Sequence, residues 1–144
     1  MFGHILVPTD CTEETKNALD IAVQMQSLEK NYEPSQRITL LHVIETIADD
    51  DTEDFQRFYS TLTKRAEKKM AQLSAPYESH LAIIEPKVLL GSRVAEILRF
   101  ALEQSVDLIL LKSHRIDQEN PTEGWGTISH KVGILASCPV MLVK

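Results

Sequence analysis

The chain alternates short apolar runs with longer stretches in which apolar residues recur at helical spacing. The apolar runs are typical of buried strands and lie at residues 4–7, 38–44, 81–90, 106–111 and 139–143. The helical stripes lie between them, at residues 12–28, 52–75, 92–102 and 128–135. Thr12 and Ser92 stand where helix N-caps are expected, and Pro86 interrupts the third apolar run. Because proline cannot donate to a strand ladder, we expect the third strand at a sheet edge.

Strict alternation of strands and helices, with strands that are apolar on both faces, predicts a parallel sheet covered by helices on both sides. Right-handed crossovers then give a doubly wound α/β fold of five strands, in either a flavodoxin-like order or the order 3-2-1-4-5. In both orders the sheet reverses direction next to the first strand, and ligands bind there beyond the carboxyl ends of the strands. The order 3-2-1-4-5 would bring Pro8, Thr9 and Asp10 together with the segment 112–115.

The composition is that of one ordinary globular domain over residues 1–144, with 43% hydrophobic and 25% charged residues. The apolar runs are too short to span a bilayer and the N-terminus lacks a signal-peptide pattern, so we expect a cytoplasmic location and no membrane partner. A net charge of −6 disfavours general nucleic-acid binding. Neither the two cysteines nor the five histidines show metal-ligand spacing, so no metal site is predicted.

Four stretches of the chain carry a resemblance to a known family. They are ILVPTDCTEETKNALDIAV (5–23), LLHVIE (40–45), LLGSRVAEILRFALEQSVDLILLKSH (89–114) and GTISHKVGILASCPVMLVK (126–144). In order and separation they resemble the strands and helices of the universal stress protein family, and the match runs from Ile5 to Val143. The resemblance implies the strand order 3-2-1-4-5, a homodimer and, in one large branch of the family, ATP or AMP bound at the switch point.

The nucleotide site of that branch maps onto this chain residue by residue. The ribose-contacting aspartate corresponds to Asp10 and the adenine-facing backbone to Val43. The phosphate pattern G-x2-G-x9-G-[ST] has its first two glycines at Lys112 and Arg115 and its last pair at Gly126-Thr127, with ten residues in place of nine before that pair. The candidate site is therefore Pro8, Thr9, Asp10, Val43, Lys112, Ser113, Arg115, Gly126 and Thr127.

Lys112 and Arg115 change the chemistry expected of this loop. Glycine lets the backbone adopt positive φ and approach a phosphate without a Cβ, and each replacement costs on the order of 1 kcal/mol in strain if the loop keeps its path. In the opposite sense, the two cations can meet phosphate with side-chain charge. The segment 112–127 also contains three acidic residues, whose negative charge does not attract ATP. We expect weak or absent ATP binding.

Several of these residues also have purely structural interpretations. Gly126-Thr127 either forms an anion site with the helix that follows or is a simple N-cap. Asp10 either contacts a ligand or caps the turn after its strand. Cys11, at a helix N-terminus, has either a lowered thiol pKa or an inert packing role. Trp125 either covers the cleft, contacts a partner or packs on its own loop. Of the five histidines, His114 is the one that we would test for function.

Two classes of function fit the sequence. The first is a homodimeric stress-response module with a degenerate adenine-nucleotide cleft, and the alternative is a nucleotide-independent interaction protein of the same fold. An enzyme is not expected, because the chain has no P-loop GxxxxGK[ST], no G-x-S-x-G turn and no His/Cys dyad. No catalytic residue is therefore predicted. The last strand, Val140–Val143, should form an apolar sheet edge, and pairing two such edges across a two-fold axis predicts the homodimer.

Overall fold

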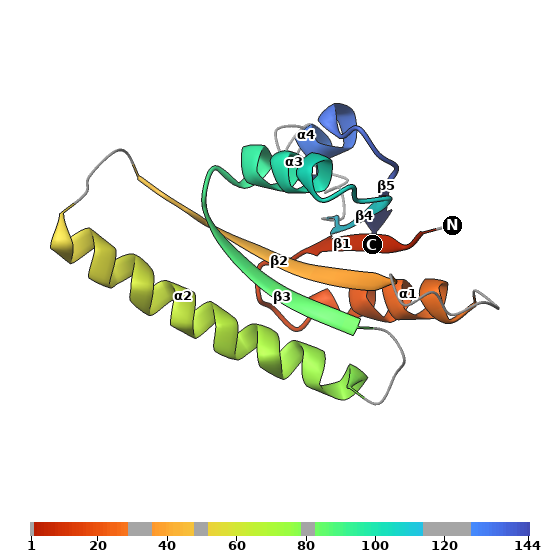
Figure 1. Cartoon of the computed structure of the whole chain (residues 1–144), viewed down its shortest axis with the longest axis horizontal. Coiled ribbons are helices and arrows are strands. Elements are labelled where there is room, and N and C mark those ends of the chain that lie inside the picture. The colour runs from red at the N-terminus through yellow and green to blue at the C-terminus, as the bar shows by residue number, and fades with distance from the viewer. Residues whose placement is uncertain (1, 29–35, 48–51, 79–82, 114–127) are drawn as a thin grey trace, which may run out of the picture.

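Five parallel strands form the centre of the molecule, and helices cover both faces of the sheet (Figure 1). The computed structural model describes residues 2–28, 36–47, 52–78, 83–113 and 128–144. The strands are β1 (His4–Pro8), β2 (Arg37–Glu45), β3 (Ile83–Gly91), β4 (Leu108–Lys112) and β5 (Val140–Val143). The helices are α1 (Thr15–Ser27), α2 (Glu53–Ser74), α3 (Arg93–Glu103) and α4 (Ile128–Leu135), and a 3-10 turn, η1 (Ala75–Tyr77), follows α2.

The strand order is β3-β2-β1-β4-β5. This confirms the doubly wound α/β prediction and selects the order 3-2-1-4-5 over the flavodoxin-like order. Figure 1 shows α1 and α2 on one face of the sheet and α3 and α4 on the other. The two crossovers that start from β1 and β3 therefore place helices on opposite faces, which leaves the carboxyl ends of β1 and β4 open between the two layers.

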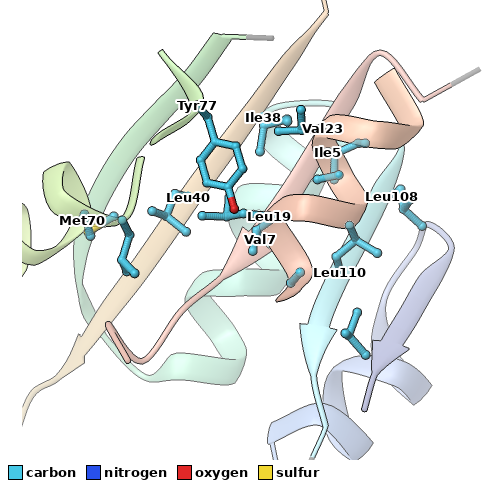
Figure 2. Packing of buried hydrophobic residues seen from close by; sticks show 14 residues of the cluster. Ile5, Val7, Leu19, Val23, Ile38, Leu40, Met70, Tyr77, Leu108 and Leu110 are labelled. Carbon is cyan, nitrogen blue, oxygen red and sulfur yellow. The ribbon is translucent and has the colours of Figure 1, made fainter. Parts of the chain in front are cut away.

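Successive residues of β1 point into two separate cores. Ile5 and Val7 pack with Leu19 and Met70 beneath α1 and α2 (Figure 2). Leu6 points to the opposite face and joins the cluster beneath α3 and α4. Because this central strand is buried on both faces, its sequence is a continuous apolar run and does not alternate with polar residues.

Helix α1 begins later than the sequence predicts. Thr12 was expected to cap it, but the helix starts at Thr15 and its N-cap position, Glu14, makes no side-chain capping hydrogen bond. The hydroxyl of Thr12 donates to the Asp10 carboxylate, with 2.6 Å between the oxygens, so it does not accept a helix amide. The prediction of Thr12 as the N-cap was therefore wrong, because the preceding aspartate holds that hydroxyl in the turn.

The predicted apolar stripes extend further than the buried faces do. In α2, Ala66, Met70 and Leu73 are buried but Phe58 is 55% exposed, because the N-terminal half of the helix extends past the bulk of the sheet (Figure 1). At the ends of two other stripes, Leu28 is 80% exposed and Leu102 is 70% exposed. The spacing of apolar residues correctly indicates which face of each helix points towards the sheet. The length of the sheet, however, decides how many of those residues are buried.

β3 confirms the prediction that was based on Pro86. The strand lies at the sheet edge, as the proline indicated. The strand runs continuously from Ile83 to Gly91, with Pro86 in register with Leu40. An edge strand needs hydrogen bonds on one side only, so a missing amide hydrogen can face away from the partner strand without breaking the ladder.

Candidate functional site

A cavity opens where β1 and β4 separate. The two strands pair directly at Ile5↔Leu108 and Leu6↔Ile109, and both continue beyond that point towards their carboxyl ends. The cavity beyond those ends has a volume of about 370 Å³. It lies at the switch point of the sheet, which is the position that the topology favours for a ligand.

The predicted site residues are partly brought together in this cavity. Five of them line it, namely Pro8, Thr9, Asp10, Val43 and Lys112. Ser113 does not: its backbone amide donates to the carbonyl of Val143 at 2.8 Å, and its hydroxyl accepts from Lys144 Nζ at 3.2 Å. Ser113 thus belongs to the junction with β5. The remaining predicted residues, Arg115, Gly126 and Thr127, lie outside the described residues, as do His114 and Trp125.

Thr9 fixes the turn that carries the aspartate. Its amide donates to the carbonyl of Leu41 at 2.8 Å, and its own carbonyl accepts from His42 Nδ1 at 2.8 Å. The hydroxyl of Thr9 is 2.7 Å from that of Thr15 and accepts from the amide of Cys11 at 2.9 Å. Both neighbouring elements, β2 and α1, therefore hold the β1–α1 turn in place.

Asp10 is held by hydrogen bonds within the same turn. Its Oδ1 accepts from the amide of Thr12 at 3.1 Å and from the hydroxyl of that residue at 2.6 Å. Partial burial by itself raises the pKa of the Asp10 carboxyl, but the Thr12 hydrogen bonds and the charge of Lys112 outweigh it and lower the pKa below its ordinary value. Asp10 thus caps its turn, as one of its two interpretations proposed, and it is an ionised carboxylate at the mouth of the cavity.

Lys112 is paired with two carboxylates from the turn between β1 and α1. Its Nζ lies 3.5 Å from Asp10 Oδ2 and also forms a salt bridge with Glu14. The hydrogen bond to Glu14, together with the charge of Asp10, raises the pKa of the ammonium group. Two carboxylates and one ammonium group give this cluster a net charge of −1, so its field does not favour a polyanionic ligand.

Sequence reasoning missed the contribution of α3 to the cavity. Arg93 and Ile97, one helical turn apart, both line it, as does Ser129 at the start of α4. The position of Arg93 was accessible from the sequence, because it follows directly on the carboxyl end of the third strand, and the carboxyl ends of parallel strands meet at one edge of the sheet. The resemblance instead assigned the phosphate contacts to the loop after β4.

Cys11 follows the packing interpretation. Burial raises the pKa of its thiol, and the negative charge of Asp10 raises it further, against an opposing effect of Lys69. The side chain packs against the core beneath α1 and α2. The alternative of a lowered pKa was wrong for a physical reason: α1 begins only at Thr15, so Cys11 precedes the helix by a full turn.

No group of three or more His, Cys, Asp or Glu side chains in the described parts of the chain is arranged to hold a metal ion. None of the described helices is both long and apolar enough to cross a membrane.

Comparison with known proteins identifies relatives over the full length of the chain. The model of the universal stress protein family matches residues 1–144. Universal stress protein YxiE from Bacillus subtilis (strain 168) is 27% identical over an alignment of length 161 that covers 100% of both chains.

Solved structures share the fold. Universal stress protein UspA from Lactobacillus plantarum superposes with a TM-score of 0.76 at 21% identity, covering 99% of this chain and 98% of its own. A universal stress protein family protein from Arabidopsis thaliana, solved with AMP bound, superposes with a TM-score of 0.65 at 17% identity, covering 98% of this chain and 90% of its own.

Proposed function

Because this chain belongs to the universal stress protein family over residues 1–144, we propose that it is a single-domain stress-response module whose cavity takes an adenine nucleotide. The observation that carries the proposal is the cavity at the switch point, where the fold gathers Pro8, Thr9, Asp10, Val43 and Lys112. The AMP held by the Arabidopsis protein of the same fold supports an adenine nucleotide as the ligand.

The charges around the cavity favour AMP over ATP. Asp10 and Glu14 together outweigh the single positive charge of Lys112, which they bind. Each further phosphate group adds negative charge to the ligand, so a triphosphate suffers more repulsion than a monophosphate from the same cluster. The replacement of two loop glycines by Lys112 and Arg115 acts in the same direction, because each adds a Cβ where the family's backbone approaches phosphate.

Calorimetric titration with adenosine, AMP, ADP and ATP tests the proposal. We expect AMP to bind at submillimolar concentration and more tightly than ATP. Mass spectrometry of the small molecules released from freshly purified protein provides an independent readout. Absence of binding heat for all four ligands at millimolar concentration would overturn the proposal.

A nucleotide-independent interaction protein is the second candidate function. It is favoured by the pairing of Lys112 with two carboxylates, since a cation that is already neutralised contributes little to phosphate binding. Adenine nucleotide in the freshly purified protein would exclude this alternative. Its absence, together with flat titrations, would establish it as the better description.

The exposed edge strand β5 supports the proposal that the protein functions as a homodimer. β5 (Val140–Val143) is the edge strand next to β4, and Met141 and Leu142 are 38% and 43% exposed. Pairing this edge with that of a second copy across a two-fold axis would cover both the apolar side chains and the free backbone groups.

We further propose that the protein is not an enzyme and acts in the cytoplasm without a nucleic-acid or membrane partner. The net charge of −6 supports the absence of nucleic-acid binding. An ATPase assay tests the first point: we expect no phosphate release above background, and a slow turnover that Asp10→Ala abolishes would contradict it.

A further inference from the structure

The cavity has two chemically different sides. On the side formed by β2 and α3, Leu41, Val43 and Ile97 present hydrocarbon. At the ends of β1 and β4, Asp10 and Lys112 present a carboxylate and an ammonium group next to the hydrocarbon of Leu111. A nucleotide has the same division, with a planar base at one end and a polar ribose phosphate at the other. Matching like with like places the base against β2 and α3.

Arg93 is the cation on the apolar side. It is the first residue of α3 and lies one turn before Ile97, so both side chains project from the same face of the helix into the cavity lining. Among the residues that the structure describes, no carboxylate forms a salt bridge with Arg93, whereas Arg99 on the same helix is paired with Glu96 and Glu103. A ligand therefore does not have to displace an ion-pair partner to reach the Arg93 guanidinium.

We propose that Arg93 contacts the base of the bound nucleotide, with its guanidinium stacked on the face of the purine. This inference rests on the proposed function, since it assigns a role in the same cavity. A guanidinium is planar, delocalised and weakly hydrated, and it stacks on aromatic rings in a way that a lysine ammonium cannot reproduce. Arg93 thus complements the hydrocarbon wall of Val43 and Ile97: the wall covers one part of the base and the guanidinium another.

The alternative chemistry for Arg93 is contact with phosphate. The residue is at the N-terminus of α3, where the backbone amides also favour negative charge. A phosphate on this side, however, would leave the hydrophobic faces of the base beside the ionised Asp10 and Lys112, whose charged groups prefer polar surroundings. The two arrangements differ in a measurable way, because adenosine has the base but lacks the phosphate.

Titrations of Arg93→Gln with adenosine and with AMP separate the two arrangements. We expect the substitution to weaken both ligands by the same factor, about 3- to 30-fold for the loss of a cation–π contact. Arg93→Lys should recover only a small part of the loss, since it restores the charge without the planar group. Arg99→Gln is the matched control, because Arg99 lies on the same helix but lines a different cavity, and it should bind both ligands like the wild type. Circular dichroism and the melting temperature check that each variant is folded.

Three outcomes would overturn the inference, and they can be told apart. A loss confined to AMP would place Arg93 at the phosphate, and unchanged affinity for both ligands would remove it from the binding site. In both cases the wild type still binds nucleotide, so the proposed function stands. A wild-type protein that binds neither ligand would remove the proposed function and this inference together.

Discussion

Lys112 at the end of β4 connects to Asp10 at the end of β1, with its Nζ 3.5 Å from Asp10 Oδ2. The contact spans the point where the two strands have stopped pairing, so it links the two edges of the cavity. Lys112 also pairs with Glu14 in the turn before α1. The cation that the sequence offers as a substitute for a phosphate-binding glycine is therefore already matched by two carboxylates.

Removing one of those carboxylates should improve nucleotide binding. In Glu14→Gln the cluster loses one negative charge, and Lys112 retains Asp10 as a carboxylate partner. We expect AMP to bind about two- to five-fold more tightly, which corresponds to the usual energy of an exposed charge pair, and ATP to gain more because it carries more charge. Calorimetric titration at low salt measures both affinities.

Glu13→Gln is the matched control for that experiment. Glu13 is the adjacent residue, but it pairs with Lys16 on α1, 2.6 Å away, whereas Glu14 pairs with Lys112. The Glu13→Gln variant should bind both nucleotides with the affinity of the wild type. Equal gains in the two variants would mean that net charge, and not the Lys112 cluster, sets the affinity.

Asp10→Ala should destabilise the fold as well as alter the cavity. It removes the acceptor of two Thr12 hydrogen bonds, and the loss of a comparable side-chain cap costs about 1 kcal/mol in the free energy of unfolding. Asp10→Asn keeps an acceptor oxygen and should recover most of that free energy. Urea denaturation of the three proteins measures the differences, and an Asn variant as unstable as the Ala variant would show that the charge and not the turn is what matters.

His4 should make the protein less stable in mild acid. Burial of the ring, aided by the charge of Arg37, lowers its pKa below the ordinary value of 6.5, although the Gln104 hydrogen bond and the charges of Asp107 and Glu85 oppose the shift. The unfolded chain then binds the proton more readily than the folded one. Stability from this residue is complete above pH 6.5 and declines as the pH falls from there towards the lowered pKa.

His4→Gln removes this titration. Urea denaturation between about pH 7 and pH 5 should show a shallower loss of stability in the variant than in the wild type, even if the variant is less stable at neutral pH, where the ring's 2.8 Å contact with Thr39 Oγ1 is lost. His130→Gln, an exposed position on α4, is the control for general effects of histidine replacement. An unchanged slope in His4→Gln would mean that other groups cause the acid sensitivity.

Met141→Lys should convert the proposed homodimer into monomers. Met141 is 38% exposed in the edge strand, so the monomer should tolerate a lysine there. In a dimer paired through this edge, the lysines of the two copies would repel each other. Sedimentation or light scattering at several concentrations gives the association state. Leu135→Lys, at a 62% exposed apolar position on α4, is the control and should stay dimeric. Dimers that persist in Met141→Lys would exclude this edge as the interface.

The sequence by itself determined the elements and the doubly wound parallel sheet, whereas the structure selected the strand order 3-2-1-4-5. Buried strands such as His4–Pro8 have apolar residues on both faces, and only a parallel sheet with two helical layers buries both. The carboxyl end of β1, with Pro8, Thr9 and Asp10, was placed correctly because topology alone brings strand ends to the switch point. Helix α4 spans Ile128–Leu135, which is the range that the sequence predicted.

The tertiary structure decided where burial stops and which charges meet. Nothing in the periodicity of residues 52–75 indicates that α2 is longer than the sheet beneath it, so the predicted stripe includes Phe58, which is 55% exposed. Lys112 and Glu14 are 98 positions apart by their numbers, and only the closing of β4 against β1 turns them into an ion pair. Local patterns record which way a side chain faces, whereas long-range electrostatics depend on distances that exist only once the chain has folded.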